Sequence, residues 1–227
     1  MKAAERMSRE FFLLGAIALI LLVAGASGWL ARVEQAGLDR LLHLNAQART
    51  LPADVVFIDI DQKSLEEMND AAGRWPWPRA VHAELVDALA RQQPKAIVFD
   101  VLFNEADQVQ PELDAIFADS VAAHPQVYLP TMLLADGDGA PLAQFPPALH
   151  IVRTPAARDD ARTPLLVPLV VPPEYWRGGT INFRPDDDGV GRSYALYHEV
   201  SGWQIPSMPR RLADDLGFEA GLFVPSG

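Results

Sequence analysis

The chain has 227 residues, of which 49% are hydrophobic and 22% are charged. This composition is typical of a folded domain with a short additional segment, and it disfavours wholesale disorder and collagen-like repeats. The sequence contains no cysteine, which excludes a disulfide scaffold, a cysteine-ligated zinc site and a thiol nucleophile.

Acidic residues set the electrostatic character of the chain. The net charge is −11, and the excess of acids is concentrated in residues 54–139. An acidic surface repels phosphate backbones, so we expect no nucleic acid partner. A cation or a basic ligand fits such a surface better.

Near the amino terminus, residues 11–30 form an uncharged apolar stretch of 20 residues. A helix of that length matches the hydrocarbon core of a bilayer, which predicts a transmembrane helix. Basic side chains precede the stretch, so we expect residues 1–10 to be cytoplasmic and the main domain to be periplasmic or extracellular, anchored in the inner (plasma) membrane. Two alternatives stay open, a signal peptide cleaved near residues 24–26 and a buried core helix.

Residues 31–53 continue with apolar positions at intervals of three or four, which indicates a stalk or linker helix. These positions are Leu30, Val33, Gly37, Leu41, Leu44 and Ala48. If the helix is a dimer-forming stalk, the protein is a homodimer. The alternative is an amphipathic helix that packs on its own domain.

Residues 54–227 form the domain that we expect to be exported, and their apolar runs predict its secondary structure. Residues 54–61 and 95–104 are short apolar runs that predict buried strands, and Pro78 opens a helix between them. A third helix then leads to a strand over residues 126–130. Strands that alternate with helices predict parallel pairing. The predicted fold class is therefore α/β, with an N-terminal transmembrane helix followed by an exported α/β domain that has a largely parallel sheet.

The later half of the domain has a different pattern. Residues 178–200 hold two β-rich runs separated by an acidic turn, which predicts a hairpin. A helix that carries Leu212 and Leu216 follows Trp203.

Oxygen-bearing side chains follow both predicted strands. They are Asp59, Asp61, Asp100, Asn104 and Asp107. Ligands bind at the carboxyl ends of parallel strands, and hard cations such as magnesium or calcium prefer oxygen ligands. One hypothesis is therefore a metal-dependent hydrolase that uses Asp59, Asp61 and Asp100. In the structural alternative, Asp59 or Asp61 caps the next helix, and Asp100 accepts backbone hydrogen bonds.

The segment WPWPRAVHAEL, residues 75–85, places Arg79 and His82 in the first turn of a helix after two Trp-Pro pairs. This arrangement suits an aromatic-walled site for an anion or carboxylate, with Arg79 as the binding fork and His82 as a pH-sensitive partner. In the structural alternative, the tryptophans hold the loop on the sheet, and Arg79 pairs with an aspartate such as Asp59 or Asp100. Motifs for a nucleophile elbow, a phosphate loop or a His-Glu zinc site do not occur, so we assign no catalytic residue and expect no cofactor.

Six segments of the sequence together resemble one known family. They are DRLLHL from Asp39, VVFIDIDQKSLEEM from Val55, GRWPWPRAVHAELVDAL from Gly73, KAIVFDVLFNEAD from Lys95, INFRPDDDGVGRSYAL from Ile181 and WQIPSMPRRLA from Trp203. The family is the second class of CHASE domains, the extracellular sensory domains associated with cyclases and histidine kinases. The resemblance spans roughly residues 33–216.

The resemblance implies a sensory module without a catalytic domain, which binds an extracytoplasmic ligand. It also implies that the module regulates a cytoplasmic adenylate cyclase, diguanylate cyclase or histidine kinase. Because the family's domain continues past the helix after Trp203, we expect residues 54–227 to be an incomplete CHASE-like domain, in an amino-terminal fragment or a truncated product. Two alternatives remain, the metal-dependent hydrolase and a membrane-tethered interaction module without output.

Overall fold

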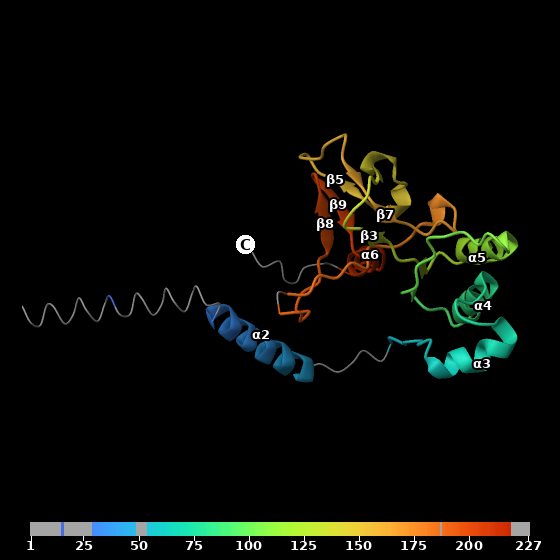
Figure 1. Ribbon diagram of the computed structural model, residues 1–227, viewed down its shortest axis with the longest axis horizontal. Coiled ribbons are helices and arrows are strands. Elements are labelled where there is room, and N and C mark those ends of the chain that lie inside the picture. Colours follow the sequence, from blue (N-terminus) through green and yellow to red (C-terminus); the bar gives the residue numbers. More distant parts are fainter. Residues whose placement is uncertain (1–14, 16–28, 49–53, 187, 219–227) are drawn as a thin grey trace, which may run out of the picture. The chain divides into compact units, whose positions relative to one another are not determined.

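The computed structural model describes residues 15, 29–48, 54–186 and 188–218 of the chain (Figure 1). The chain divides into two compact units, with the boundary between Asp59 and Ile60.

In the first unit, helix α2 spans Trp29–Ala48. Its apolar side chains Val33, Leu38, Leu41 and Leu44 are all more than two fifths exposed. The described part of the first unit therefore contains a helix whose leucines remain accessible to solvent.

The predicted transmembrane helix over residues 11–30 lies outside the described residues, except for positions 15, 29 and 30. Within the described ranges, no helix combines the length and the apolar character that a membrane crossing requires. The 20-residue helix α2 is long enough, but it carries Arg32, Glu34, Asp39 and Arg40. The expectation of an N-terminal transmembrane helix is therefore not supported.

The strand expected over residues 54–61 is not formed. Residues 55–61 have no regular secondary structure, and Val56 and Phe57 are 81% and 90% exposed. A continuously apolar strand requires a neighbour that pairs with its backbone and layers that cover both of its faces. In the structure, this segment has neither the pairing of a strand nor the burial.

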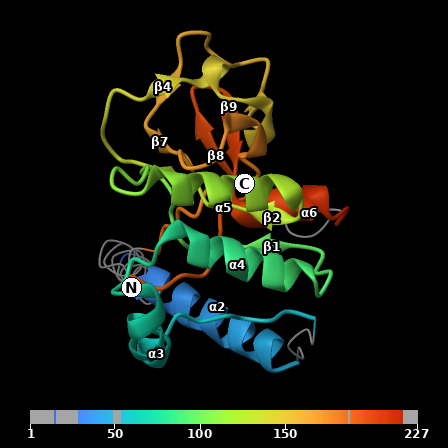
Figure 2. The ribbon, with the colours of Figure 1, turned by 90° about the vertical axis from the view of Figure 1, so that its right-hand side faces the viewer.

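The second unit begins with helices α3 (Gln62–Ala72) and α4 (Arg79–Ala90), and α5 (Pro111–Ala123) follows later in the chain. Helices α4 and α5 lie side by side (Figure 2). Near the carboxyl end of α4, Asp87 accepts hydrogen bonds from the Ser120 hydroxyl at 2.7 Å and from the His124 ring at 3.0 Å. These bonds tie α4 to the last turn of α5 and the residue that follows it.

The described strands of the second unit are short and fall into four small sheets. The first sheet pairs β1 (Ile97–Val98) with β2 (Val127–Tyr128). The second pairs β3 (Met132–Leu133) with β7 (Leu165–Leu166), and the third pairs β4 (Ala140–Pro141) with β6 (Arg162–Thr163). In the fourth, β9 (Trp203–Pro206) pairs with both β5 (Val152–Arg153) and β8 (Tyr197–Val200). Three short 3-10 helices, η1 (Leu142–Gln144), η2 (Pro147–Leu149) and η3 (Pro173–Tyr175), lie between them, and helix α6 spans Met208–Asp215.

The prediction of a largely parallel sheet is wrong. Among the described strands, β1 and β2 are parallel, and every other strand pair is antiparallel. Prolines at positions 94, 125 and 130 flank β1 and β2, and proline cannot donate to a strand ladder. In the described part of the chain, parallel contact beyond β2 is limited to isolated bridges, from Thr131 to Thr180 and from Thr180 to Ser207.

The hairpin expected at residues 178–200 is formed in a different place. In the expected turn region, the Asp186 N–H donates to the Val190 carbonyl at 3.0 Å, and the Gly189 N–H donates to the Asp186 carbonyl at 2.8 Å. The described residues of the two expected runs are irregular, and the hairpin is instead made by β8 and β9.

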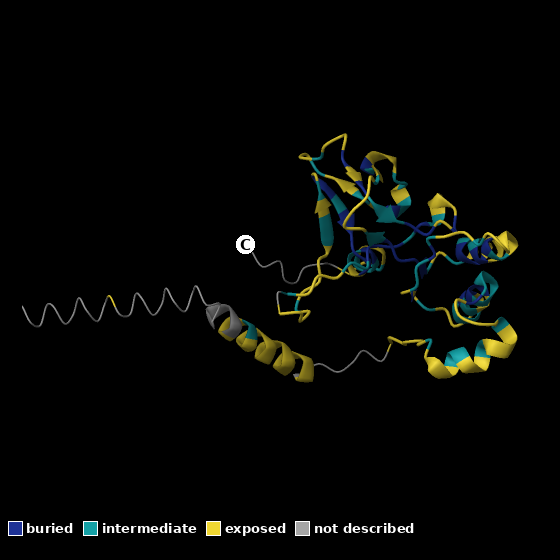
Figure 3. Ribbon diagram, in the orientation of Figure 1, coloured by how far each residue is buried: buried dark blue, intermediate teal, exposed yellow. Residues whose placement is uncertain are grey.

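The main core of the second unit lies where α4 and α5 meet β1 and β2. Its fully buried residues include Val86 on α4, Phe117 on α5, Phe103 in the segment after β1 and Val127 on β2. Figure 3 shows buried segments on both helices and exposed ones beside them. A second, smaller core contains Leu142, Ala161, Trp203 and Ile205.

Candidate functional site

The linker between α3 and α4 holds the two Trp-Pro pairs. Pro78 stands at the N-cap position of α4, and Arg79 is the first helical residue. Trp77 is buried at 8% exposure, whereas Trp75 is 41% exposed. The linker therefore buries one indole and leaves the other partly at the surface.

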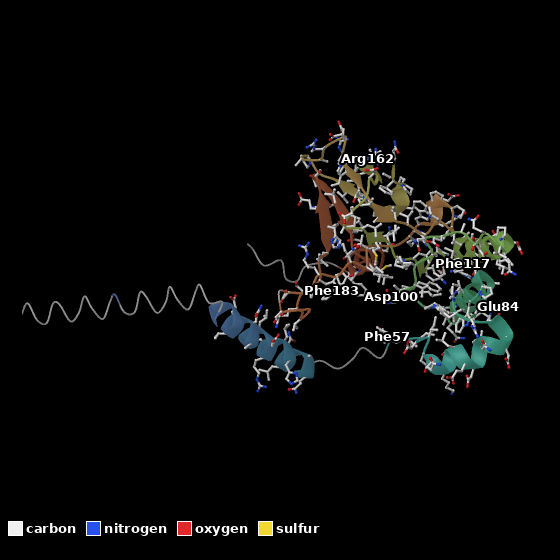
Figure 4. All side chains as sticks on the ribbon, in the orientation of Figure 1. Phe57, Glu84, Asp100, Phe117, Arg162 and Phe183 are labelled. Atoms are coloured by element: carbon white, nitrogen blue, oxygen red, sulfur yellow. The ribbon has the colours of Figure 1, made fainter. Side chains whose placement is uncertain are left out.

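Six rings form what we call the aromatic cluster: Trp75, Trp77, His82, Phe99, Phe103 and Phe117. The His82 ring is central, because its centroid lies 5.3 Å from that of Phe103, 5.9 Å from Trp75, 6.3 Å from Phe99, 6.4 Å from Phe117 and 6.5 Å from Trp77. The cluster thus joins the linker, α4, the segment after β1 and α5. In Figure 4, the labelled residues Glu84 on α4, Asp100 in the segment after β1 and Phe117 on α5 mark three of these parts.

His82 is almost fully buried, at 1% exposure, and its Nε2 atom has no hydrogen-bond partner in the described part of the protein. Burial among rings disfavours the charged imidazolium, and the nearby Arg79 charge disfavours it further. Together they lower the pKa of His82 from 6.5 to about 4. The imidazole is therefore neutral at neutral pH.

Arg79 is held between an aromatic ring and a carboxylate. Its guanidinium carbon lies 5.0 Å from the centre of the Phe103 ring, and its Nε atom lies 3.6 Å from Oδ1 of Asp114. One Nη atom donates to the Glu105 carbonyl at 3.4 Å. The partner of Arg79 is thus an aspartate, as the structural alternative expects, but it is Asp114 and neither Asp59 nor Asp100.

Asp114 also holds the loop that precedes α5. Its Oδ2 atom accepts the Asp107 N–H at 2.7 Å. The Asp107 carboxylate in turn accepts the N–H groups of Gln110 and Val109 at 2.9 and 2.8 Å, and these bonds lower the pKa of Asp107. Asp114 Oδ1 is buried without a hydrogen bond, although it lies close to Arg79.

The structure brings Arg79, His82 and Asp107 together around α4 and α5. Among the described contacts, none joins the other candidate residues to these three. Asp61 caps α3, because its Oδ1 atom accepts the Ser64 N–H at 2.8 Å and the Ser64 hydroxyl at 2.7 Å, which lowers its pKa. Asp59 and Asp100 are exposed, and Asn104 is half-buried. No group of three or more histidine and acidic side chains in the described ranges could hold a metal ion.

Asp114 is a functional candidate that the sequence analysis missed, and the structure adds a detail to Trp77, which was expected to wall an aromatic site. Trp77 Nε1 is buried without a hydrogen-bond partner in the described part. The signal for Asp114 is present in the sequence, since this acid lies three and seven residues before Phe117 and Val121 on the buried stripe of α5. A carboxylate on an apolar helix face requires a buried partner.

Comparison with known families gives one match over most of the chain. A family model described as the CHASE2 domain matches residues 15–221, a range that includes every residue of the aromatic cluster. No curated protein and no solved structure matches the chain significantly.

Proposed function

The chain belongs to the CHASE2 domain family, and we propose that it is the input module of a membrane receptor that regulates a cytoplasmic adenylate cyclase, diguanylate cyclase or histidine kinase. CHASE2 domains are extracellular sensory modules of signalling receptors and are not catalytic. In this proposal, the second unit lies outside the cytoplasm, and the output enzyme is a separate domain of the receptor.

The aromatic cluster is the observation that supports a sensory role best. It joins four parts of the second unit, so a change at one of its rings acts on all of them. Trp77 Nε1, His82 Nε2 and Asp114 Oδ1 are buried there without hydrogen-bond partners in the described part. Buried polar atoms without partners raise the free energy of the folded state. A stimulus that gives them partners, or changes their charge, therefore shifts the conformational equilibrium.

A pair of fusions tests the location of the module. Alkaline phosphatase folds to an active enzyme only after export, and green fluorescent protein fluoresces only when it folds in the cytoplasm. We expect phosphatase activity and little fluorescence when each reporter is fused after residue 218. The opposite pattern would rule out an extracytoplasmic sensor.

Output measurements in the receptor that carries this module test the sensory role. We expect His82→Leu to change the basal activity of the cyclase or kinase several-fold, because the substitution alters the ring cluster that joins α4 to α5. Glu84→Gln is the matched control, since Glu84 lies on the same helix and is exposed. Equal output from both variants would argue against a role of the cluster in signalling.

The exposed leucines of α2 favour a second candidate function, self-association through this helix. Leu38, Leu41 and Leu44 recur at intervals of three and are 44%, 65% and 46% exposed. If two copies pair through this face, Leu41→Glu should shift the protein from dimer to monomer in sedimentation, whereas Gln47→Glu should not. A monomeric parent chain would exclude this function.

A further inference from the structure

His82 is the ionisable member of the aromatic cluster, and five aromatic rings surround it. Phe99, Phe103 and Phe117 contact it edge to face, and the indoles of Trp75 and Trp77 lie on its linker side. A charged imidazolium in this position would have almost no contact with water, because His82 is 1% exposed, and its Nε2 atom would have no hydrogen-bond partner in the described part.

The charged groups on the surrounding elements do not favour an imidazolium. They are Arg79 on α4, Arg74 on the linker, Asp100 and Asp107 in the segment after β1, and Asp114 on α5. Arg79 opposes the positive charge of a protonated His82. Asp114 is engaged with Arg79 and with the Asp107 N–H, Asp107 binds two backbone N–H groups, and Asp100 is exposed.

We propose that His82 makes the junction of α4 and α5 an acid-sensitive switch, which is closed while the imidazole is neutral and opens when it is protonated. This inference rests on the proposed sensory function, because it names an external proton as the input. In the open state, water reaches His82, and its ring separates from the rings on α5 and after β1.

The direction of the switch follows from the two protonation equilibria. In the closed state His82 has a pKa of about 4, and in an open, hydrated state it regains its ordinary value of 6.5. The open state therefore binds protons more tightly, and acid favours it. The ratio of open to closed molecules rises roughly 70-fold between about pH 7.5 and about pH 4.5.

The position of His82 explains why its protonation reaches beyond one side chain. The Arg79 to Asp114 pair lies one turn earlier on α4, and Asp114 holds the loop before α5 through the Asp107 N–H. Movement of the first turn of α4 away from Phe103 therefore loosens Arg79 and then the loop. Near the other end of the two helices, Asp87, Ser120 and His124 keep α4 and α5 attached.

Two measurements on the full chain, purified in mild detergent, test the switch. The first is the NMR titration of the His82 ring, which we expect to have a midpoint well below 6.5. The second is hydrogen exchange of α4, corrected for the intrinsic pH dependence of exchange. We expect α4 protection to fall by a factor on the order of 50 as the pH drops from about 7.5 to about 4.5, reversibly.

Variants separate the switch from general acid damage. His82→Leu keeps a side chain of similar bulk that cannot be protonated, so we expect α4 protection to stay constant over the same pH range. His150→Gln is the control, because this histidine is half exposed and lies outside the cluster, and it should behave as the parent chain does. If His82→Leu does not fold, the ring titration of the parent chain still decides the question.

Three results would overturn the proposal. They are a His82 titration midpoint near 6.5 with α4 still protected, a parent chain whose α4 protection is constant down to about pH 4.5, and an acid transition that persists in His82→Leu. All of these are measured without an output enzyme. A failed switch would thus leave the fusion results for the sensory module untouched, and reversed fusion results would not alter the titration.

Discussion

Each oxygen of Asp114 serves a different element. Oδ2 accepts the backbone N–H of Asp107, and Oδ1 faces the Arg79 guanidinium on α4. Its side chain is 10% exposed, so water replaces these contacts poorly. Loss of the carboxylate would leave a backbone N–H and a cation together in a poorly hydrated place.

We expect Asp114→Ala to lower the free energy of unfolding by about 2 to 4 kcal/mol, because it leaves both partners of the carboxylate unpaired. Urea unfolding followed by tryptophan fluorescence measures this change. Asp119→Ala on the same helix is the control, since Asp119 is exposed and should be nearly neutral. A similar small effect of both substitutions would mean that the Asp114 contacts contribute little.

The Asp61 carboxylate caps α3 through Ser64, and it is fully exposed, so its effect is local. We expect Asp61→Ala to increase hydrogen exchange in the first turn of α3 without a measurable change in global stability. Its pKa is lowered in the folded state, so the cap is present above the ordinary value of 3.8 and weakens as the pH falls below it. Asp70→Ala, near the other end of α3, should leave the first turn as protected as in the parent chain.

At the level of elements, the path of β2 depends on a close backbone approach. The Leu129 N–H donates to the Arg177 carbonyl at 2.8 Å, immediately after β2. A Cβ atom on Gly178 would lie 1.8 Å from the Leu129 carbonyl oxygen, which is a backbone atom and cannot rotate away. Glycine is therefore required at position 178 because a side chain would collide with the Leu129 backbone, and not because of unusual backbone angles.

Gly178→Ala should destabilise the second unit by roughly 2 kcal/mol or more, because the segment at residues 177–181 must move away from Leu129 and break its hydrogen bonds. Thermal unfolding of the purified chain measures the shift. Gly37→Ala is the matched substitution at a helical position with open space around it, and it should be neutral or slightly stabilising. Equal melting temperatures for Gly178→Ala and the parent chain would contradict this packing argument.

Helices were easier to predict from the sequence than strands. Pro78 was expected to open a helix, and it stands at the N-cap position of α4, where the missing proline N–H costs nothing. The expected strand at residues 95–104 is reduced to Ile97–Val98, and the one at 54–61 is not formed. Apolar composition alone does not reveal whether a strand has a neighbour, because strand pairing depends on residues distant in the sequence.

The candidate site was predictable only in part for the same reason. The tryptophans, Arg79 and His82 lie within one short segment, so their proximity follows from local sequence. The partner of Arg79 does not, because Asp114 is 35 residues away and reaches Arg79 only through the packing of α5 on α4. Likewise, the shared position that the sequence suggested for Asp59, Asp61 and Asp100 assumed that residues 54–61 and 95–104 form neighbouring parallel strands, and the first of these strands is not formed.

At the scale of the whole molecule, acid has two opposing effects on the stability of the folded chain. The chain carries a net charge of −11 at neutral pH, so mild acid reduces the mutual repulsion of its carboxylates. In contrast, burial lowers the pKa values of His82, His150 and His198, and the unfolded chain then binds more protons than the folded one. The histidine contribution to stability is therefore fully present above 6.5 and is lost as the pH falls below it.

His82 should dominate this loss, because it is the most deeply buried of these histidines. A shift from 6.5 to about 4 corresponds to about 3 kcal/mol between the two ends of that interval. We expect urea unfolding of the parent chain to show falling stability from about pH 6.5 to about pH 4, and His82→Leu to remove most of that slope. His43→Gln, in an exposed position of the first unit, should retain it. If His82→Leu and the parent chain lost stability in parallel, groups other than His82, and not the aromatic cluster, would cause the loss of stability in acid.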